Sequence, residues 1–309
     1  MAAGKHRRQQ FTGPKKITIT TAGTSTPTNY QIKVTVAYES AMQATFADIR
    51  FKTKAGVNID YWIESKTDGV TADVWLELPD AITDPGSDYI WMYYGNPALS
   101  GASNIGNTFL FGDDFSGDLS KWGFNIPANW EITDGVLNHI PTTDEFGKAL
   151  FDAPTNFIIE GNVKTPTAGV QQFMFLSGRH PDDYSVAGND VAFGLAIFPG
   201  TTEGYNIYSA GWVSGAHTII ADQLYKIKGI FNGTNVDLYV DYPDADYIFR
   251  VNATTALEYT KVGIHAGFVA NIKYDNIRVR KYIANEPTVA VGTAQLLRRT
   301  SHMHRHYPK

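Results

Sequence analysis

The sequence predicts an all-β protein with two β-sandwich (jelly-roll) domains and extended basic arms at both ends. Apolar and polar residues alternate with period two through most of the chain, which is the pattern of half-buried strands. Clusters of Gly, Pro, Asn and Asp separate these runs at short intervals, as in sandwiches. A length of 309 residues suits two domains, and 43% hydrophobic residues can fill two cores.

The strands of the first domain are expected at 30–36, 47–52, 58–63, 74–78 and 88–94. Those of the second are expected at 157–164, 170–177, 191–198, 245–251 and 272–281. A hairpin should join 225–231 to 236–240, because Asn232-Gly233 tolerates the positive φ angles of tight turns. Glu39–Phe46 is the one helix-like stretch. Trp62, Trp75, Trp91, Trp122 and Trp130 lie in strand patterns and are expected to fill cores.

A segment rich in Gly, Asn and Ser runs from Gly95 to Asp114, and new strands follow it. The domain boundary is therefore placed within that segment. The predicted organisation is a basic N-terminal arm at 1–16, a first sandwich at 17–111, a second sandwich at 112–292 and a basic, His-rich tail at 293–309.

Charge is divided between the body and the ends. Residues 17–297 contain all 31 acidic residues but only 17 of the 26 basic ones, a net charge of −14, and the ends carry +9. The predicted assembly arms comprise Lys5, Arg7, Arg8, Lys15, Lys16, Arg298, Arg299 and Arg305. Such arms can meet nucleic acid, an anionic lipid surface or the acidic body of a neighbouring copy, or can be solvated tails. Contact with acidic subunits is favoured, and the absence of a base-reading motif excludes sequence-specific nucleic-acid recognition.

Several classes of protein are excluded. The chain has no cysteine, so disulfides, thiolate metal sites and thiol chemistry are unavailable. No apolar run approaches the roughly 18 residues of a membrane span. Residues 1–16 lack the apolar stretch of a secretory signal. We therefore expect a protein made in a cytoplasm, with a location at the cell surface or outside the cell as the alternative.

Residues 28–111 resemble a domain-of-unknown-function family of archaeal and bacterial surface proteins. The resemblance lies in Asp48-Ile-Arg-Phe51, Tyr61-Trp-Ile-Glu-Ser65, Val74-Trp-Leu76 and, above all, the closing Tyr93-Tyr-Gly-Asn-Pro97. The family has no established catalytic residues, so the resemblance implies none here.

Residues 111–292 resemble a concanavalin A-like (laminin G-like) lectin domain. The matching segments are Asp113-Asp-Phe-Ser116 with Trp122, Trp130–Leu137 and the closing strand Tyr274–Arg280. The resemblance implies a jelly roll, but this fold is shared by lectins, glycanases and structural modules, so it does not settle the function.

A glycan platform is predicted where aromatic residues lie among Gly, Ser and Asn, because flat rings beside amides and hydroxyls suit the CH faces of sugars. The candidate carbohydrate-binding residues are Tyr184, Asn189, Tyr205, Tyr208 and Trp212. The alternative is a tyrosine-rich strand that packs within a sheet.

No organic cofactor is expected, but the acidic pairs allow one structural calcium ion, since hard cations prefer oxygen ligands. The specific candidate ligands are Asp113 and Asp114 in the opening loop and Asp275 in the closing strand. Aspartates are also common turn formers, which is the alternative explanation.

Catalysis is not expected. A retaining glycanase needs two carboxylates roughly 5–5.5 Å apart, and no Glu-x-Asp-x-x-Glu motif is present. The nearest arrangements, Asp60 with Glu64 and Glu131 with Asp134, lack the third acid.

Three hypotheses follow. The first is a non-enzymatic structural or attachment protein of a virion (capsid, decoration or tail), whose partners are copies of itself, neighbouring structural proteins and host-surface glycans. The second is a cell-surface or secreted carbohydrate-binding adhesion module. The third is a glycan hydrolase, which the missing acid pair disfavours.

Overall fold

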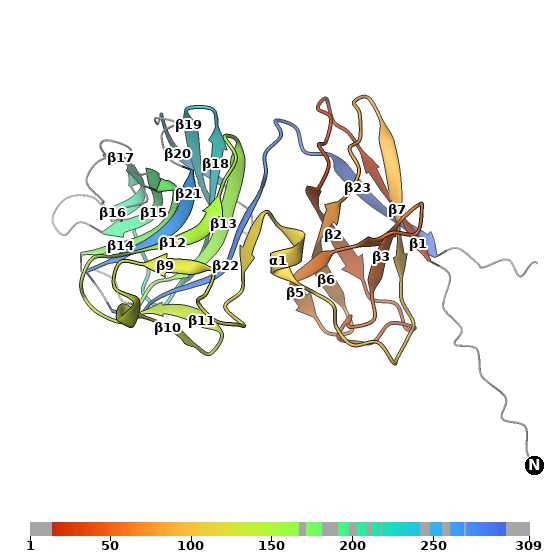
Figure 1. The fold of residues 1–309 in the computed structure, drawn as a ribbon, viewed down its shortest axis with the longest axis horizontal. Helices are drawn as coiled ribbons and strands as arrows, with labels where there is room; N and C mark the ends of the chain where they lie inside the picture. The colour runs from red at the N-terminus through yellow and green to blue at the C-terminus, as the bar shows by residue number, and fades with distance from the viewer. Residues whose placement is uncertain are drawn as a thin grey trace, which may run out of the picture. The chain divides into compact units, whose positions relative to one another are not determined.

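The structure, a computed structural model, describes residues 14–294 apart from 167–170, 181–190, 198–202, 209–211, 217, 242–247, 255–259 and 269. The chain divides into two compact units. The first contains Met1–Asn104 and Ala284–Lys309, and the second contains Ile105–Ile283. In the described residues, 23 strands form four sheets whose pairings are antiparallel (Figure 1). The all-β prediction is confirmed.

The boundaries differ from the predicted ones at 111/112 and 292/293. The chain leaves the first unit at residue 104 and returns to it at residue 284. The cause is the last strand, β23, which pairs with β1 at the start of the chain rather than with the second sandwich.

The first unit contains eight strands in its described residues. They are β1 (Lys15–Thr20), β2 (Tyr30–Ala37), β3 (Arg50–Thr53), β4 (Asn58–Ile59), β5 (Tyr61–Thr67), β6 (Thr71–Leu78), β7 (Ser87–Tyr93) and β23 (Thr288–Ala294). One sheet has the order β23-β1-β7-β3-β4, and the other has the order β2-β6-β5. The alternation seen in the sequence places Val74 and Leu76 of β6, and Ile17 and Ile19 of β1, in the buried core.

Two predicted arm residues belong to this sandwich instead. Lys15 and Lys16 open β1, which pairs with both β7 and β23. Lys15 is buried and forms an ion pair with Glu39, and Lys16 lies 4.4 Å from the ring centroid of Tyr89. The assignment of these two lysines to a free arm is therefore wrong. The other six arm residues lie outside the described residues.

The helix expected at Glu39–Phe46 is also wrong. The segment forms two successive turns, in which Met42 N–H bonds to the Glu39 carbonyl and Phe46 N–H to the Gln43 carbonyl. Phe46 has φ = 58°, a left-handed value that ends any helix there. Its ring is fully buried, so packing fixes this backbone.

The second unit holds the longer strands. They are β8 (Phe111–Asp113), β9 (Trp122–Phe124), β10 (Trp130–Thr133), β11 (Val136–His139), β12 (Glu145–Asp152), β13 (Phe157–Lys164), β14 (Gln172–His180), β15 (Val191–Ile197), β16 (Glu203–Tyr208), β17 (Trp212–Ala216), β18 (Leu224–Asn232), β19 (Asn235–Val240), β20 (Ile248–Thr254), β21 (Lys261–Gly267) and β22 (Ile272–Lys281). A short helix, α1 (Ile105–Thr108), precedes them, and a 3₁₀ turn, η1 (Pro127–Asn129), leads into β10.

Two large sheets face each other in this unit. The eight-stranded sheet has the order β10-β11-β22-β13-β18-β19-β20, with β8 also paired to β22. The seven-stranded sheet has the order β17-β16-β15-β14-β21-β12-β9. The predicted hairpin is present as β18–β19, in which Asn232 pairs with Asn235 and Gly233 has φ = 59°.

The core between these sheets is continuous and aromatic. Phe193 of β15 packs edge-on against Phe231 of β18, with centroids 5.8 Å apart. A Cβ at Gly229 would lie 2.4 Å from the ring of Phe193, so only glycine lets the two sheets approach here. Of the five tryptophans expected in cores, four are buried, and Trp91 is the exception. No helix in the described residues has the length and apolar character of a membrane span.

Candidate functional site

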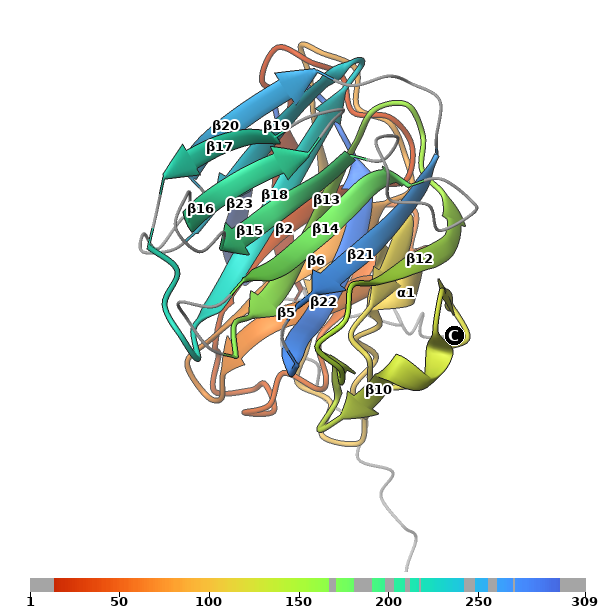
Figure 2. The ribbon, with the colours of Figure 1, turned by 90° about the vertical axis from the view of Figure 1, so that its left-hand side faces the viewer.

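The seven-stranded sheet has one face on the core and one face turned away from it, which we call the outer face. Figure 2 shows β12, β21, β14, β15, β16 and β17 side by side at this face. Leu176, Phe193 and Ile207 are register neighbours and belong to the core. Residues one step along each strand therefore lie at the outer face.

Two rows of register positions cross the outer face. The first row is Phe146, His265, Phe175, Gly194, Asn206 and Ser214. The second row is Lys148, Gly263, Ser177, Ala192, Tyr208 and Trp212. Aromatic, amide and hydroxyl residues thus share one face of the sheet.

The register brings only part of the predicted glycan platform together. Tyr208 of β16 pairs directly with Trp212 of β17, so these two positions share the outer face at the edge of the sheet. Position 205 is an odd number of steps from 208 and shares the alternation of Ile207, which is buried in the core. Tyr205 therefore does not belong to the outer face. Tyr184 and Asn189 lie outside the described residues.

A histidine–carboxylate pair lies on the same face. His265 Nε2 is 2.6 Å from Asp144 Oδ1, and the imidazole is packed at 4.1 Å against the ring of Phe146. His265 is only 5% exposed, whereas Asp144 is partly open to solvent. The carboxylate holds the buried ring in one orientation, and Asp144 is the member of the pair that solvent reaches.

Sequence reasoning missed this pair because no strand was expected at Lys261–Gly267. The signal was present, since Val262, Ile264 and Ala266 are apolar at alternate positions, and all three are fully buried. The intervening His265 would then have been placed on the opposite face.

The predicted calcium ligands come close together, as the pairing of β8 with β22 requires. Asp113 pairs with Ile277, two residues from Asp275. Both oxygens of Asp113 accept protein hydrogen bonds, Oδ1 from Phe115 N–H and Oδ2 from the Trp122 indole at 2.7 Å. Among the described residues, no group of three or more His, Cys, Asp or Glu side chains is arranged to hold a metal ion. Calcium binding here stays a prediction.

The third acid of this group is electrostatically perturbed. The pKa of Asp275 is raised to about 6, mainly by burial and also by the negative charges of Asp114 and Asp113, against the lowering effect of the Asn276 backbone N–H. Asp114 itself accepts a 2.7 Å hydrogen bond from the Ser116 hydroxyl. The charges of Asp113 and Asp114 thus disfavour the ionised form of Asp275.

The glutamates of the two nearest acid pairs are each bonded to neighbouring side chains. Glu64 Oε2 accepts a 3.0 Å hydrogen bond from the Trp75 indole and forms an ion pair with Lys33 Nζ at 2.8 Å. Glu131 Oε1 accepts bonds from Thr133 and Asn138. Each of these glutamates is engaged by protein donors within its own sheet.

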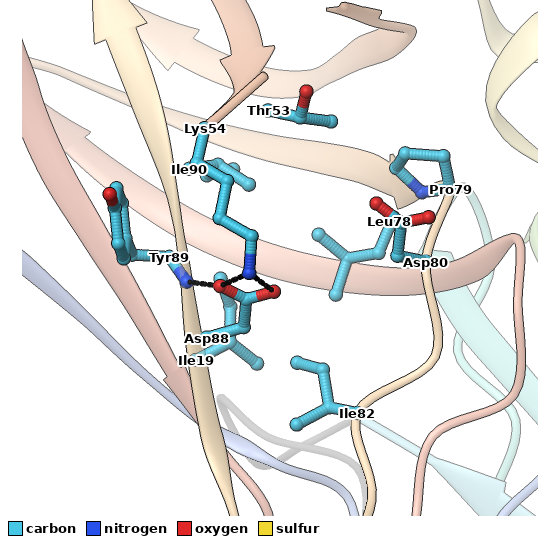
Figure 3. A pocket seen from close by; sticks show the side chains of 10 residues that line it. All are labelled: Ile19, Thr53, Lys54, Leu78, Pro79, Asp80, Ile82, Asp88, Tyr89 and Ile90. Carbon is cyan, nitrogen blue, oxygen red and sulfur yellow. Dashed lines mark hydrogen bonds and ion pairs between the residues drawn. The ribbon is translucent and has the colours of Figure 1, made fainter. Parts of the chain in front are cut away.

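A shallow recess, open to solvent, is lined by residues of β1, β3, β6 and β7 and of the loop after β6 (Figure 3). Ile19, Leu78 and Ile82 give it an apolar wall. Lys54 crosses it and bonds both oxygens of Asp88, at 3.0 and 2.9 Å, and this hydrogen-bonded ion pair raises the pKa of Lys54. Lys54 and Asp88 neutralise each other's charge, so the recess is small and apolar, with this ion pair across it.

A domain of unknown function (DUF2341) matches residues 45–130. This match agrees in part with the resemblance seen at 28–111, and it extends across the end of the first unit. No curated protein sequence matches the chain.

Solved structures similar to this chain include carbohydrate-active proteins. The carbohydrate binding module CBM66 from Bacillus subtilis has 15% identity and a TM-score of 0.42, covering 52% of this chain and 96% of its own. The endo-beta-1,3-glucanase from Pyrococcus furiosus has 14% identity and a TM-score of 0.42, covering 57% and 94%. A GH43 protein from Bacillus licheniformis has 15% identity and a TM-score of 0.44, covering 79% and 57%.

One prediction is overturned by these comparisons. The chain was expected not to be an enzyme, because it lacks a Glu-x-Asp-x-x-Glu motif. The similar structures include glycosyl hydrolases as well as a binding module. The missing motif therefore does not exclude enzymes, and the prediction is withdrawn.

Proposed function

We propose that the second unit binds a carbohydrate on the outer face of its seven-stranded sheet. The observation that carries this proposal is the direct pairing of Tyr208 with Trp212 at the edge of that face. Aromatic rings give a sugar an apolar surface, and Tyr and Trp add a polar group at the rim.

The rest of the outer face supports the same ligand. Asn206 and Ser214 form the neighbouring register pair, with amide and hydroxyl groups that suit sugar hydroxyls. The Asp144–His265 pair lies further along the same row of positions as Asn206.

The proposal is tested with the full chain and a panel of neutral oligosaccharides on a glycan array, followed by calorimetry on the best binder. We expect Trp212→Ala and Tyr208→Ala to weaken binding at least tenfold. Val213→Ala is the matched control, because position 213 lies on the same strand but on the opposite face, and it should retain affinity within twofold. A blank array, or undiminished binding by Trp212→Ala, would overturn the proposal.

A finer proposal is that this binding attaches a virion to host-surface glycans, with copies tied together by the basic termini. Its support is the charge division of the sequence. With Lys15 and Lys16 assigned to β1, residues 15–297 carry a net charge of −12 and the two ends carry seven basic residues, a charge of +7. Native mass spectrometry of the full chain tests self-association: a monomer at all concentrations contradicts it.

A further inference from the structure

The middle strand of the five-stranded sheet carries a row of aromatic residues on the face away from the core. In β7, Ile90 and Met92 are buried, and the alternate residues Tyr89, Trp91 and Tyr93 are half-buried at the opposite face. The rings of Tyr89 and Trp91 meet edge-to-face, with centroids 5.4 Å apart. This is the reason why Trp91 is absent from the core.

Lysines flank this row on both sides. Trp91 pairs with Lys16 of β1 and with Lys52 of β3. Lys16 Nζ lies 4.4 Å from the Tyr89 centroid, a cation–π contact. The side chain of Lys52 makes no hydrogen bond or ion pair with another described residue. Its ammonium group is therefore available to a ligand.

No carboxylate occupies this face among the described residues. Its other register positions are Thr18, Thr20, Arg50, Asn58, Ser87, Thr288 and Ala290. Three of the face's residues are cationic, although Arg50 is bound to the carbonyls of Ala47, Ile49 and Ser100. In a protein whose body carries a net charge of −14, this is a locally positive and hydroxyl-rich surface.

The topology adds further positive charge at one end of the sheet. Lys15 pairs with Ala294, so the chain leaves toward both termini from the same end of β1 and β23. The segments beyond contain Lys5, Arg7, Arg8, Arg298, Arg299, Arg305 and Lys309, and no acidic residue.

We propose that this face of the first unit binds an acidic polysaccharide, with a sugar ring against Trp91 and its carboxylates or sulfates at Lys16 and Lys52. The site is separate from the outer face of the second unit and does not rest on the function proposed above. The threonine, serine and asparagine residues suit sugar hydroxyls. A glycan whose carboxylates or sulfates lie on separated sugars matches two lysines on either side of Trp91, whereas nucleic acid carries a phosphate at every nucleotide.

Calorimetry on the full chain tests the proposal. The probes are hyaluronan and chondroitin oligosaccharides, whose carboxylates lie on alternate sugars, and neutral dextran is the blank. Each titration is run at low salt and at about 150 mM NaCl, because salt screens charge–charge attraction. Lys16→Gln combined with Lys52→Gln should weaken binding at least tenfold and reduce its salt dependence. Trp91→Leu should weaken binding with an unchanged salt dependence. Lys226→Gln with Lys273→Gln, at two lysines of intermediate exposure in the second unit, is the matched control and should retain affinity within twofold.

Three outcomes would overturn the proposal. Wild-type affinity in the folded Lys16/Lys52 double variant would mean that the termini alone bind the polyanion. Absence of binding to both probes would remove the ligand class. Tighter binding to oligo(dT) or to phosphatidylserine vesicles than to either glycan would assign the face to nucleic acid or to a membrane surface. Unfolding midpoints of all variants verify that each is folded.

Discussion

The indole N–H of Trp122 donates a 2.7 Å hydrogen bond to Asp113 Oδ2, and both side chains are buried in the second sandwich. Asp113 ends β8, whose partner is β22, and Trp122 begins β9 in the opposite sheet. One carboxylate therefore joins the two sheets at the point where the chain enters this unit. Its other oxygen accepts the Phe115 N–H, and Phe115 has φ = 50°, so the same group also fixes the turn.

The first prediction concerns this contact. Asp113→Leu should destabilise the second unit by about 2 to 4 kcal/mol, because it leaves the buried Trp122 and Phe115 N–H groups without acceptors. Urea unfolding followed by tryptophan fluorescence measures the change. Asp114→Leu is the control, since Asp114 bonds only to the exposed Ser116, and it should cost less than about 1 kcal/mol. Equal effects of the two variants would contradict the assignment.

The second prediction concerns a buried carboxylate between two arginines. Glu160 is 2% exposed, and Arg278 and Arg280 contact its two oxygens at 2.5 and 3.1 Å. Burial by itself raises the pKa of Glu160, but the charges of Arg278 and Arg280 outweigh it and lower the pKa to about 2. Glu160→Gln should cost about 3 to 5 kcal/mol at pH 7, because two buried guanidinium groups lose their counter-charge.

The pH dependence of this contribution has a defined sign. The folded pKa lies below the unfolded value of 4.5, so the stabilisation is present above pH 4.5 and is lost as pH falls toward 2. The deficit of Glu160→Gln relative to wild type should therefore shrink between pH 4.5 and 3 in urea titrations. Glu131→Gln, at an exposed position, serves as the reference. A deficit that stays constant down to pH 3 would be inconsistent with a low pKa.

The strands were predictable because their signal is local. Ile32, Val34 and Val36 alternate with polar, exposed residues, and that pattern alone predicts which face of β2 is buried. The pairing of β23 with β1 was not predictable from the sequence. It joins Lys15 to Ala294, almost 280 positions apart, and the residue pattern within a strand does not indicate which strand it pairs with.

The candidate sites show the same division. Aromatic residues at 205, 208 and 212 could be found by composition, but only the register separates Tyr205 from the Tyr208–Trp212 pair. Trp91 lies in an apolar, aromatic run that indicates a core strand, and its place on the exposed face follows from the burial of Ile90 and Met92 beside it. Asp275 lies within β22, and the pairing of Asp113 with Ile277 brings Asp113 and Asp114 near it, whereas calcium binding by these three residues stays a prediction.

The last prediction concerns the raised pKa of Asp275 beside Asp113 and Asp114. The folded pKa of Asp275, about 6, lies above its ordinary value of 3.8, so the folded state takes up a proton first and loses stability as pH rises through 6. Asp275→Asn should therefore be more stable than wild type by about 1 to 2 kcal/mol at pH 8, allowing for solvent screening of the partly exposed carboxyl, with no difference near pH 4. Asp134→Asn, at an exposed turn position with φ = 55° that asparagine tolerates, should show no such trend.

Wild type and Asp275→Asn also test the calcium prediction, because a bound ion would need the Asp275 charge. Added calcium would then raise the melting temperature of wild type but not of Asp275→Asn. Equal melting temperatures with and without calcium in wild type would exclude the ion, and greater stability of wild type than Asp275→Asn at pH 8 without calcium would contradict the repulsion among the three acids.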